Sequence, residues 1–206
     1  MPLDDVWKTF QSSVGIFWKG RFDEVPPTPG VYAWFYPLRV TSFELDEFLR
    51  EVRRVHLYDA RTGREPYAGG INRVGWSSLH WTASLNNPDV RLSDDVRAAW
   101  EKLASEPAEF DKLRRVVLRA SLLMPPLYVG KAINLRNRSS QHLSGRSDFA
   151  SRFEHRAGEL DLHASRVRDL LLVTLRTEEI GTENTGTERL VEEILKSVAK
   201  PPYGVQ

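Results

Sequence analysis

The chain has no cysteine among its 206 residues. Disulfide scaffolds and thiolate metal sites are therefore excluded, and a reducing compartment fits this composition. No stretch approaches the roughly 18 apolar residues that a membrane span needs. The residues from Met1 to Asp5 are acidic at their end and lack a long apolar run, so they do not resemble a secretory signal. We therefore expect a cytoplasmic protein that does not associate with a membrane.

A strong net charge is also absent, because 29 cations face 28 carboxylates and the formal net charge is +1. Nucleic-acid-binding domains that rely on bulk charge commonly have a pI above about 9, whereas the pI of this sequence is about 8.0. The positive charge is local instead. Between positions 131 and 156, six cations stand against two carboxylates, and five of the six are arginine. Arginine binds phosphate through a bidentate fork, so this segment is a candidate phosphate-binding region.

Three segments of the sequence are typical of β-strands. Residues 31–36 are aromatic and β-branched and lie between Pro29 and Pro37, residues 127–129 form a short strand ended by Gly130, and residues 170–175 are continuously apolar. A period of two along the first strand places alternate side chains on one face, namely Tyr32, Trp34 and Tyr36.

The remaining patterns predict helices and one turn-rich segment. The amphipathic residues 1–24 predict a short helix packed on the core, and residues 58–92 are rich in turns. Ser93, Asn134 and Thr187 are expected helix caps. We expect helices over residues 43–55, from 93 onward, and over 108–123, 135–143, 147–158 and 188–199. Strands and helices are mixed, which predicts an α/β or α+β domain.

Side chains suited to phosphodiester chemistry follow the second predicted strand. Arg138 and His142 lie four residues apart and share one face of a predicted helix. Arginine stabilises negative charge in a transition state, and an imidazole near neutrality can move a proton. Tyr128 lies just upstream. A free tyrosine has a pKa near 10, so its use as a base requires nearby cations such as Arg138 or Lys131.

A metal ion would offset the negative charge of a phosphodiester. Mg²⁺ is typically held by one or two carboxylates, water and substrate phosphate. Glu188 and Glu192 lie four residues apart on one face of the last predicted helix, and either carboxylate is available for this purpose.

These pieces together resemble the GIY-YIG nuclease superfamily. Gly30-Val31-Tyr32 is similar to the first family signature, and Tyr128-Val129-Gly130 is similar to the second. The family tail Asn-Leu-x-x-Arg-x-x-x-His stands here, at the family spacing, as Asn134, Leu135, Arg138 and His142. The resemblance covers residues 25–36 and 121–206, about half of the chain.

The resemblance implies a small mixed sheet of three strands flanked by helices. It implies catalytic roles for Tyr32, Tyr128, Arg138 and His142 around the scissile phosphate. It further implies one Mg²⁺ or Mn²⁺ ion on a glutamate of a later helix. Counting back nine residues from Pro201 favours Glu192, with Glu188 as the second choice. The expected nucleic-acid contacts are Lys131, Asn134, Arg136 and Arg146.

The chain departs from the family pattern in two places. About 95 residues separate Tyr32 from Tyr128, whereas the family signatures usually lie one hairpin apart. We therefore expect an N-terminal helical extension (1–24), a nuclease core (25–36 and 121–206) and a largely helical insertion (37–120) that helps to recognise the substrate. The family also usually has an asparagine shortly after its Pro-x-Tyr motif, where this chain has Gly204 and then Gln206.

The expected function is a divalent-metal-dependent endonuclease that hydrolyses duplex DNA in restriction or defence. Because one such site cuts one strand, we expect a double-strand break to need a homodimer or a second encounter with the DNA. Two alternatives remain open, namely a structure-specific repair or recombination nuclease and a non-cleaving nucleic-acid-binding module with a decayed site. Taken singly, the tyrosines also fit half-buried strand aromatics, and Arg138 with His142 also fits a solvated helix face.

Overall fold

A computed structural model describes residues 11–56, 92–177, 187–199 and 201–203. The chain divides into two compact units, one made of Met1–Pro37 with Met124–Gln206 and the other of Leu38–Leu123. The limits of the second unit lie close to those of the insertion placed at 37–120 from the sequence. The turn-rich segment up to residue 91 and Gly204 with Gln206 lie outside the described residues.

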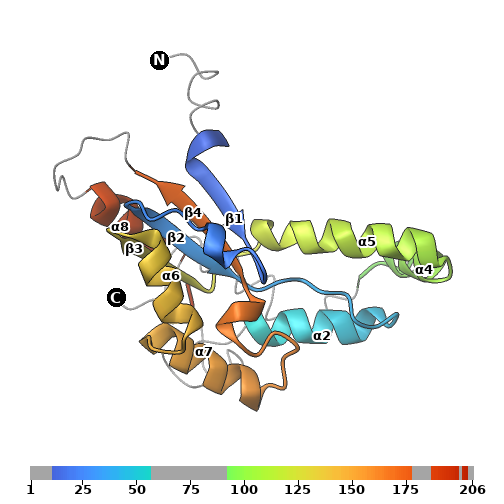
Figure 1. Cartoon of the computed structure of the whole chain (residues 1–206). Coiled ribbons are helices and arrows are strands. Elements are labelled where there is room, and N and C mark those ends of the chain that lie inside the picture. The colour runs from blue at the N-terminus through green and yellow to red at the C-terminus, as the bar shows by residue number, and fades with distance from the viewer. Residues whose placement is uncertain (1–10, 57–91, 178–186, 200, 204–206) are drawn as a thin grey trace. The chain divides into compact units, whose positions relative to one another are not determined.

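A four-stranded antiparallel sheet forms the centre of the first unit (Figure 1). Its strands are β1 (Val14–Phe17), β2 (Gly30–Phe35), β3 (Tyr128–Ala132) and β4 (Leu171–Arg176), and their order is β1-β4-β2-β3. The α+β class is confirmed, but the prediction of three mixed strands is wrong. All three neighbouring pairs are antiparallel. The additional strand β1 lies inside the segment predicted to be a helical extension, because it pairs with the outer edge of β4.

The strand register places the two signature tyrosines on one face of the sheet. Tyr32 lies opposite Gly130 of β3, and Trp34 lies opposite Tyr128. Directly opposed residues share a face, so both tyrosines point to the same side. Gly130 was expected to end this strand, but the strand continues to Ala132. A Cβ atom at Gly130 would lie 2.5 Å from the Tyr32 hydroxyl, so the glycine allows the tyrosine side chain to cross the neighbouring strand.

Three α-helices belong to the described part of the first unit, namely α6 (Leu135–Leu143), α7 (Asp148–Glu159) and α8 (Thr187–Ala199). As predicted, α6 begins after Asn134, whose Oδ1 accepts a hydrogen bond from the Asn137 amide at 2.9 Å. Ser147 caps α7 in the same way, because its Oγ accepts the Ala150 amide at 3.1 Å. Two short 3-10 helices, η1 (Phe22–Glu24) and η4 (Val167–Asp169), connect these elements. A series of aromatic rings packs α7 against β2, β3 and the C-terminal segment: Trp34, Tyr128, Phe149, Phe153 and Tyr203.

The described part of the second unit is helical, with α2 (Leu45–His56), α4 (Asp94–Ala104), α5 (Pro107–Ala120) and the 3-10 helix η3 (Ser121–Leu123). Its buried core contains Val40, Trp100 and Phe110. The Trp100 indole donates a hydrogen bond to the Phe43 carbonyl at 2.6 Å. Ser93 precedes α4 as predicted, but its side chain makes no capping hydrogen bond. None of the helices in the described ranges is both long and apolar enough to cross a membrane.

Candidate functional site

The face of the sheet that carries Tyr32 also carries Tyr128. Their ring centroids lie 6.0 Å apart. Tyr32 is almost completely buried, whereas Tyr128 is half-buried and stacks on Phe149 of α7 with ring centroids 4.6 Å apart. The less buried tyrosine is therefore the one that a ligand can reach more easily.

Helix α6 brings Arg138 and His142 to the same place. The Tyr32 hydroxyl lies 2.7 Å from Nε2 of His142, a residue 110 positions later in the chain. The Arg138 Nε donates a hydrogen bond to the same hydroxyl at 3.2 Å, and its Nη1 donates to Oε1 of Gln141 at 2.7 Å. Three side chains from β2 and α6 thus meet at one phenolic oxygen. We call Tyr32, Tyr128, Arg138 and His142 the Tyr–Arg–His cluster.

Burial controls the protonation of this cluster. The pKa of His142 is lowered to about 3. Burial is the main cause, and the neighbouring Arg138 cation acts in the same direction. The imidazole is therefore neutral near pH 7, which differs from the sequence-based expectation of a group that titrates near neutrality. Burial also raises the pKa of Tyr32 well above its ordinary value, and the adjacent Tyr128 adds to this effect, while Arg138 opposes it. In the described conformation, Tyr32 thus keeps its proton.

Helix α8 packs against β3 and β2, the strands that carry the two tyrosines. Glu192 is only 7% exposed, and its Oε1 lies 2.9 Å from Nζ of Lys196, one helical turn further on. Glu188 is half-buried and accepts a hydrogen bond from Oγ1 of Thr177 at 2.6 Å. This hydrogen bond holds the pKa of Glu188 below its ordinary value. Both candidate metal ligands are thus on the packed side of the helix.

The polarity of α8 is reversed compared with an ordinary surface helix, which turns its apolar stripe toward the core. Glu192 is buried, while three apolar side chains on the opposite side are 51–68% exposed, namely Leu190, Ile194 and Val198. Burying a carboxylate costs free energy unless it is paired or bound to a cation. Glu192 meets this condition through the ammonium group of Lys196, so α8 turns an ion pair rather than its apolar side chains toward the sheet.

A hard divalent cation fits this position in its ligand chemistry. The buried carboxylate of Glu192 already attracts one cation, the ammonium group of Lys196. No group of three or more His, Cys, Asp or Glu side chains gathers within the ranges that the structure describes. A single carboxylate is sufficient for Mg²⁺ when water and substrate phosphate complete its coordination. Glu192 is therefore the residue that would hold the ion, with Glu188 one turn away.

The four residues predicted to contact nucleic acid differ in their surroundings. Lys131 and Arg146 are exposed. Asn134 is engaged as the cap of α6. The Nε of Arg136 donates a hydrogen bond to the Val25 carbonyl at 2.8 Å, so it ties the segment before β2 to α6. Lys131 and Arg146 thus have charged groups available to a ligand, whereas the other two have structural contacts.

Sequence reasoning missed two polar neighbours of the Tyr–Arg–His cluster. The Oγ of Ser147 lies 2.6 Å from Nδ1 of His142. Thr174 of β4 is buried and lies opposite Tyr32 in the sheet register. Ser147 could be recognised from the sequence only as the start of a helix, because its contact with the imidazole depends on how α7 turns back after α6.

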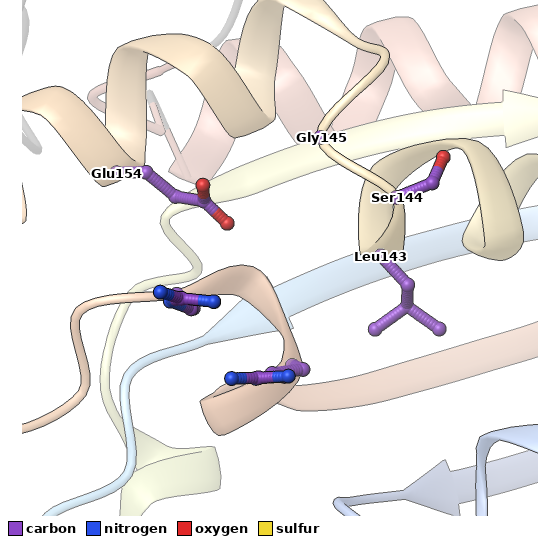
Figure 2. Close-up of a pocket in the computed structure, with 6 residues that line it drawn as sticks. Leu143, Ser144, Gly145 and Glu154 are labelled. Atoms are coloured by element: carbon purple, nitrogen blue, oxygen red, sulfur yellow. The ribbon is translucent and has the colours of Figure 1, made fainter.

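A pocket lies at the end of α6, close in sequence to His142. Figure 2 shows Glu154 of α7 on the opposite side of the pocket from Leu143 and Ser144. The pocket is lined by Leu143, Ser144, Gly145, Glu154, Arg166 and Arg168. Oε1 of Glu154 accepts a hydrogen bond from the Val167 amide at 3.2 Å, which ties η4 to α7. None of the site residues predicted from the sequence lines this pocket, so it is separate from the Tyr–Arg–His cluster.

No protein-family model matches this chain, and the searches of curated proteins and of solved structures found no match either.

Proposed function

We propose that this protein is a divalent-metal-dependent endonuclease of the GIY-YIG type that hydrolyses phosphodiester bonds in DNA. The observation that carries the proposal is the meeting of Arg138 and His142 with the Tyr32 hydroxyl, next to Tyr128. The sequence motifs indicate the same four residues. Their meeting depends on contacts between residues more than 100 positions apart, which helix or strand periodicity alone does not produce.

Arg138 is the group best placed to bind the scissile phosphate. The Nε and Nη1 atoms of its guanidinium group donate hydrogen bonds to Tyr32 and Gln141, and the side chain is half-exposed. Its charge would stabilise the negative charge that develops on the phosphoryl oxygens, which is commonly the largest contribution to this kind of catalysis. Lys131 and Arg146 would contact flanking phosphates.

The tyrosines would orient and deprotonate the attacking water molecule. Water would attack phosphorus in line with the departing oxygen, with a tyrosine oxygen accepting its proton. Tyr32 can act in this way only as a phenolate, and the hydrogen bond from Arg138 to its oxygen favours that form, whereas burial opposes it. Mg²⁺ or Mn²⁺ held by Glu192 would offset negative charge on the phosphate.

The finer assignment is a restriction or defence enzyme in the cytoplasm that acts on duplex DNA. The second unit would supply substrate recognition, and a homodimer would supply the second cut, because one cluster cuts one strand. Preference for flaps or junctions over a duplex sequence would instead indicate a repair or recombination enzyme.

The ion pair between Glu192 and Lys196 supports a second candidate function. A lysine that neutralises the metal ligand is compatible with a module that binds nucleic acid without cutting it. The intact Tyr–Arg–His cluster favours cleavage, because a binding module has no need for a buried tyrosine–histidine contact.

The test is cleavage of supercoiled plasmid at low salt with Mg²⁺, with Mn²⁺ or with EDTA. Low salt is used because phosphate contacts weaken steeply as the salt concentration rises. We expect metal-dependent nicking that falls by at least about 100-fold in Glu192→Ala. The matched control is Glu193→Ala, because Glu193 is the next residue of α8 and is exposed.

The other outcomes separate the alternatives. Loss of cleavage in Glu188→Ala but not in Glu192→Ala would move the metal site by one helical turn. Binding of DNA in a gel-shift assay without cleavage of plasmid or branched substrates would contradict the nuclease and favour the binding module.

A further inference from the structure

Ser147 is the N-cap residue of α7, in the short segment that connects α6 to α7, and its side chain contacts His142 of the Tyr–Arg–His cluster. Ser147 is only 9% exposed. Its Oγ lies 2.6 Å from Nδ1 of His142 and accepts a hydrogen bond from the Ala150 amide at 3.1 Å. One hydroxyl group therefore serves both as a helix cap and as the partner of the imidazole.

The position of the hydroxyl proton follows from these two contacts. A serine hydroxyl has one proton and two acceptor lone pairs, and the Ala150 amide occupies one lone pair. Among the described residues, the only acceptor within hydrogen-bond distance of this hydroxyl proton is Nδ1 of His142. A buried donor that is left unpaired costs free energy, so the hydroxyl donates to Nδ1. Because the imidazole is neutral and accepts at Nδ1, its own proton is on Nε2.

The tautomer of His142 determines whether the Tyr32 oxygen accepts or donates the hydrogen bond between the two side chains. With its proton on Nε2, His142 donates to the Tyr32 oxygen at 2.7 Å, and the Arg138 Nε donates to the same oxygen at 3.2 Å. Two donors then stabilise negative charge on the phenolic oxygen. With the proton on Nδ1, Tyr32 would have to donate to Nε2, and the imidazole would hold the phenolic proton in place.

We propose that Ser147 is a positioning residue that holds His142 in the Nε2–H tautomer, so that the Tyr32 oxygen accepts two hydrogen bonds. When Tyr32 acts as a base, its phenolic proton has to pass to solvent, because neither Ser147 nor His142 gains or loses a proton in this arrangement. The catalytic meaning of this arrangement rests on the proposed nuclease function. The tautomer itself does not, since it is a property of the folded chain.

The first experiment measures the tautomer directly by NMR of full-length protein with 15N-labelled histidine. The ring-nitrogen signals of His142 are assigned by comparison with His142→Gln. We expect protonated Nε2 and unprotonated Nδ1 near neutral pH in the natural sequence. In Ser147→Gly we expect a shift toward the Nδ1–H form, and in Ser147→Thr, which keeps the hydroxyl, the original signals.

Glycine is chosen because replacing a serine cap by glycine affects helix stability much less than replacing it by alanine. The loss of the hydroxyl is thereby separated from the loss of the cap. If Ser147→Gly does not fold, the tautomer in the natural sequence and in Ser147→Thr still decides the matter. Protonated Nδ1 in the natural sequence, or an unchanged tautomer in Ser147→Gly, would overturn the proposal.

The second experiment measures the rate of plasmid nicking in the same variants. We expect a loss of about tenfold in Ser147→Gly, the size of one net hydrogen bond, and recovery of most of the rate in Ser147→Thr. An unchanged rate in Ser147→Gly would overturn the positioning role. A tautomer shift in a protein that cuts no nucleic acid would support the tautomer assignment and contradict the proposed nuclease function instead.

Discussion

Helices α6 and α8 pack on the same two strands, β2 and β3, yet they bury polar side chains in different ways. On α6, both ring nitrogens of the buried His142 have hydrogen-bond partners from other elements, Tyr32 and Ser147. On α8, the buried Glu192 is paired with Lys196 of its own helix. The buried polar side chain of α6 thus has hydrogen-bond partners outside its own helix, whereas the buried carboxylate of α8 has its partner within the same helix.

The difference indicates what each helix contributes. A fully satisfied buried network is rigid and holds one geometry, which suits a group that positions others. A buried ion pair is weak evidence for stability, because apolar replacements are often as stable. Under the proposed function, α6 holds the Tyr–Arg–His cluster in place and α8 presents a carboxylate for an ion that comes with the substrate.

Removal of the Arg138 side chain tests the α6 part of the comparison most strongly. Under the proposed function, we expect Arg138→Ala to lower the nicking rate by about 100- to 1,000-fold, because it would remove the principal charge proposed to face the phosphate. DNA binding in a gel-shift assay should change much less. The matched control is Arg168→Ala, an exposed arginine of η4 outside the cluster. Equal losses in both variants would contradict a specific role for Arg138.

Gly130→Ala tests whether the sheet must leave room for Tyr32. The new Cβ would lie 2.5 Å from the Tyr32 hydroxyl and 2.9 Å from the Tyr128 ring, so we expect a loss of about 1–3 kcal/mol in urea unfolding. Gly158 of α7 is a matched control because nothing lies within 4 Å of its Cβ position. There we expect alanine to stabilise the protein by about 0.5–1 kcal/mol. A neutral Gly130→Ala would show that the tyrosine moves easily.

The protonation of His142 makes stability depend on pH in a defined window. Its pKa falls from 6.5 to about 3 on folding, mainly because of burial and then because of Arg138. As the pH falls, the unfolded chain therefore binds the proton before the folded protein does. The contribution of the neutral imidazole to the free energy of unfolding is fully present above about pH 6.5 and is lost as the pH falls toward 3.

Urea unfolding of the natural protein and of His142→Gln, at about pH 7 and about pH 5, measures this contribution. We expect the natural protein to lose up to about 1.4 kcal/mol more per pH unit than the variant. Parallel pH profiles for the two proteins would show that His142 is more accessible to solvent than its burial indicates.

Replacing one of the exposed apolar side chains of α8 is expected to have the smallest effect on the free energy of unfolding. Ile194 is 51% exposed, so Ile194→Gln should change the free energy of unfolding by less than about 0.5 kcal/mol. Leu135 of α6 is a counterpart that is 1% exposed, and Leu135→Ala should cost about 2–5 kcal/mol. A large, concentration-dependent effect at Ile194 would mean that another surface covers the exposed apolar side chains of α8.

Local patterns predicted α6 well. Its limits agree with the prediction of 135–143, and Asn134 makes the expected cap. Both features depend on residues within one or two turns of each other. The strand β1 was missed because its apolar residues also fit a helical period, and only the free edge of β4 makes the extended form favourable. Gly130 was misassigned for a related reason, since only the crossing Tyr32 side chain explains a glycine within the strand.

The choice of Tyr32 and Tyr128 follows from the resemblance of their motifs to a known family. The amino-acid sequence by itself determined the spacing of Arg138 and His142 on one helix face and the alternation along β2. These properties come from the periods of helix and strand, which act over a few residues. The tertiary structure alone decided that the Tyr32 hydroxyl meets an imidazole 110 positions away, that Ser147 lies behind that imidazole, and that α8 turns Glu192 inward. The physical reason is that these contacts join residues far apart in the chain, and their geometry is set by the packing of whole elements.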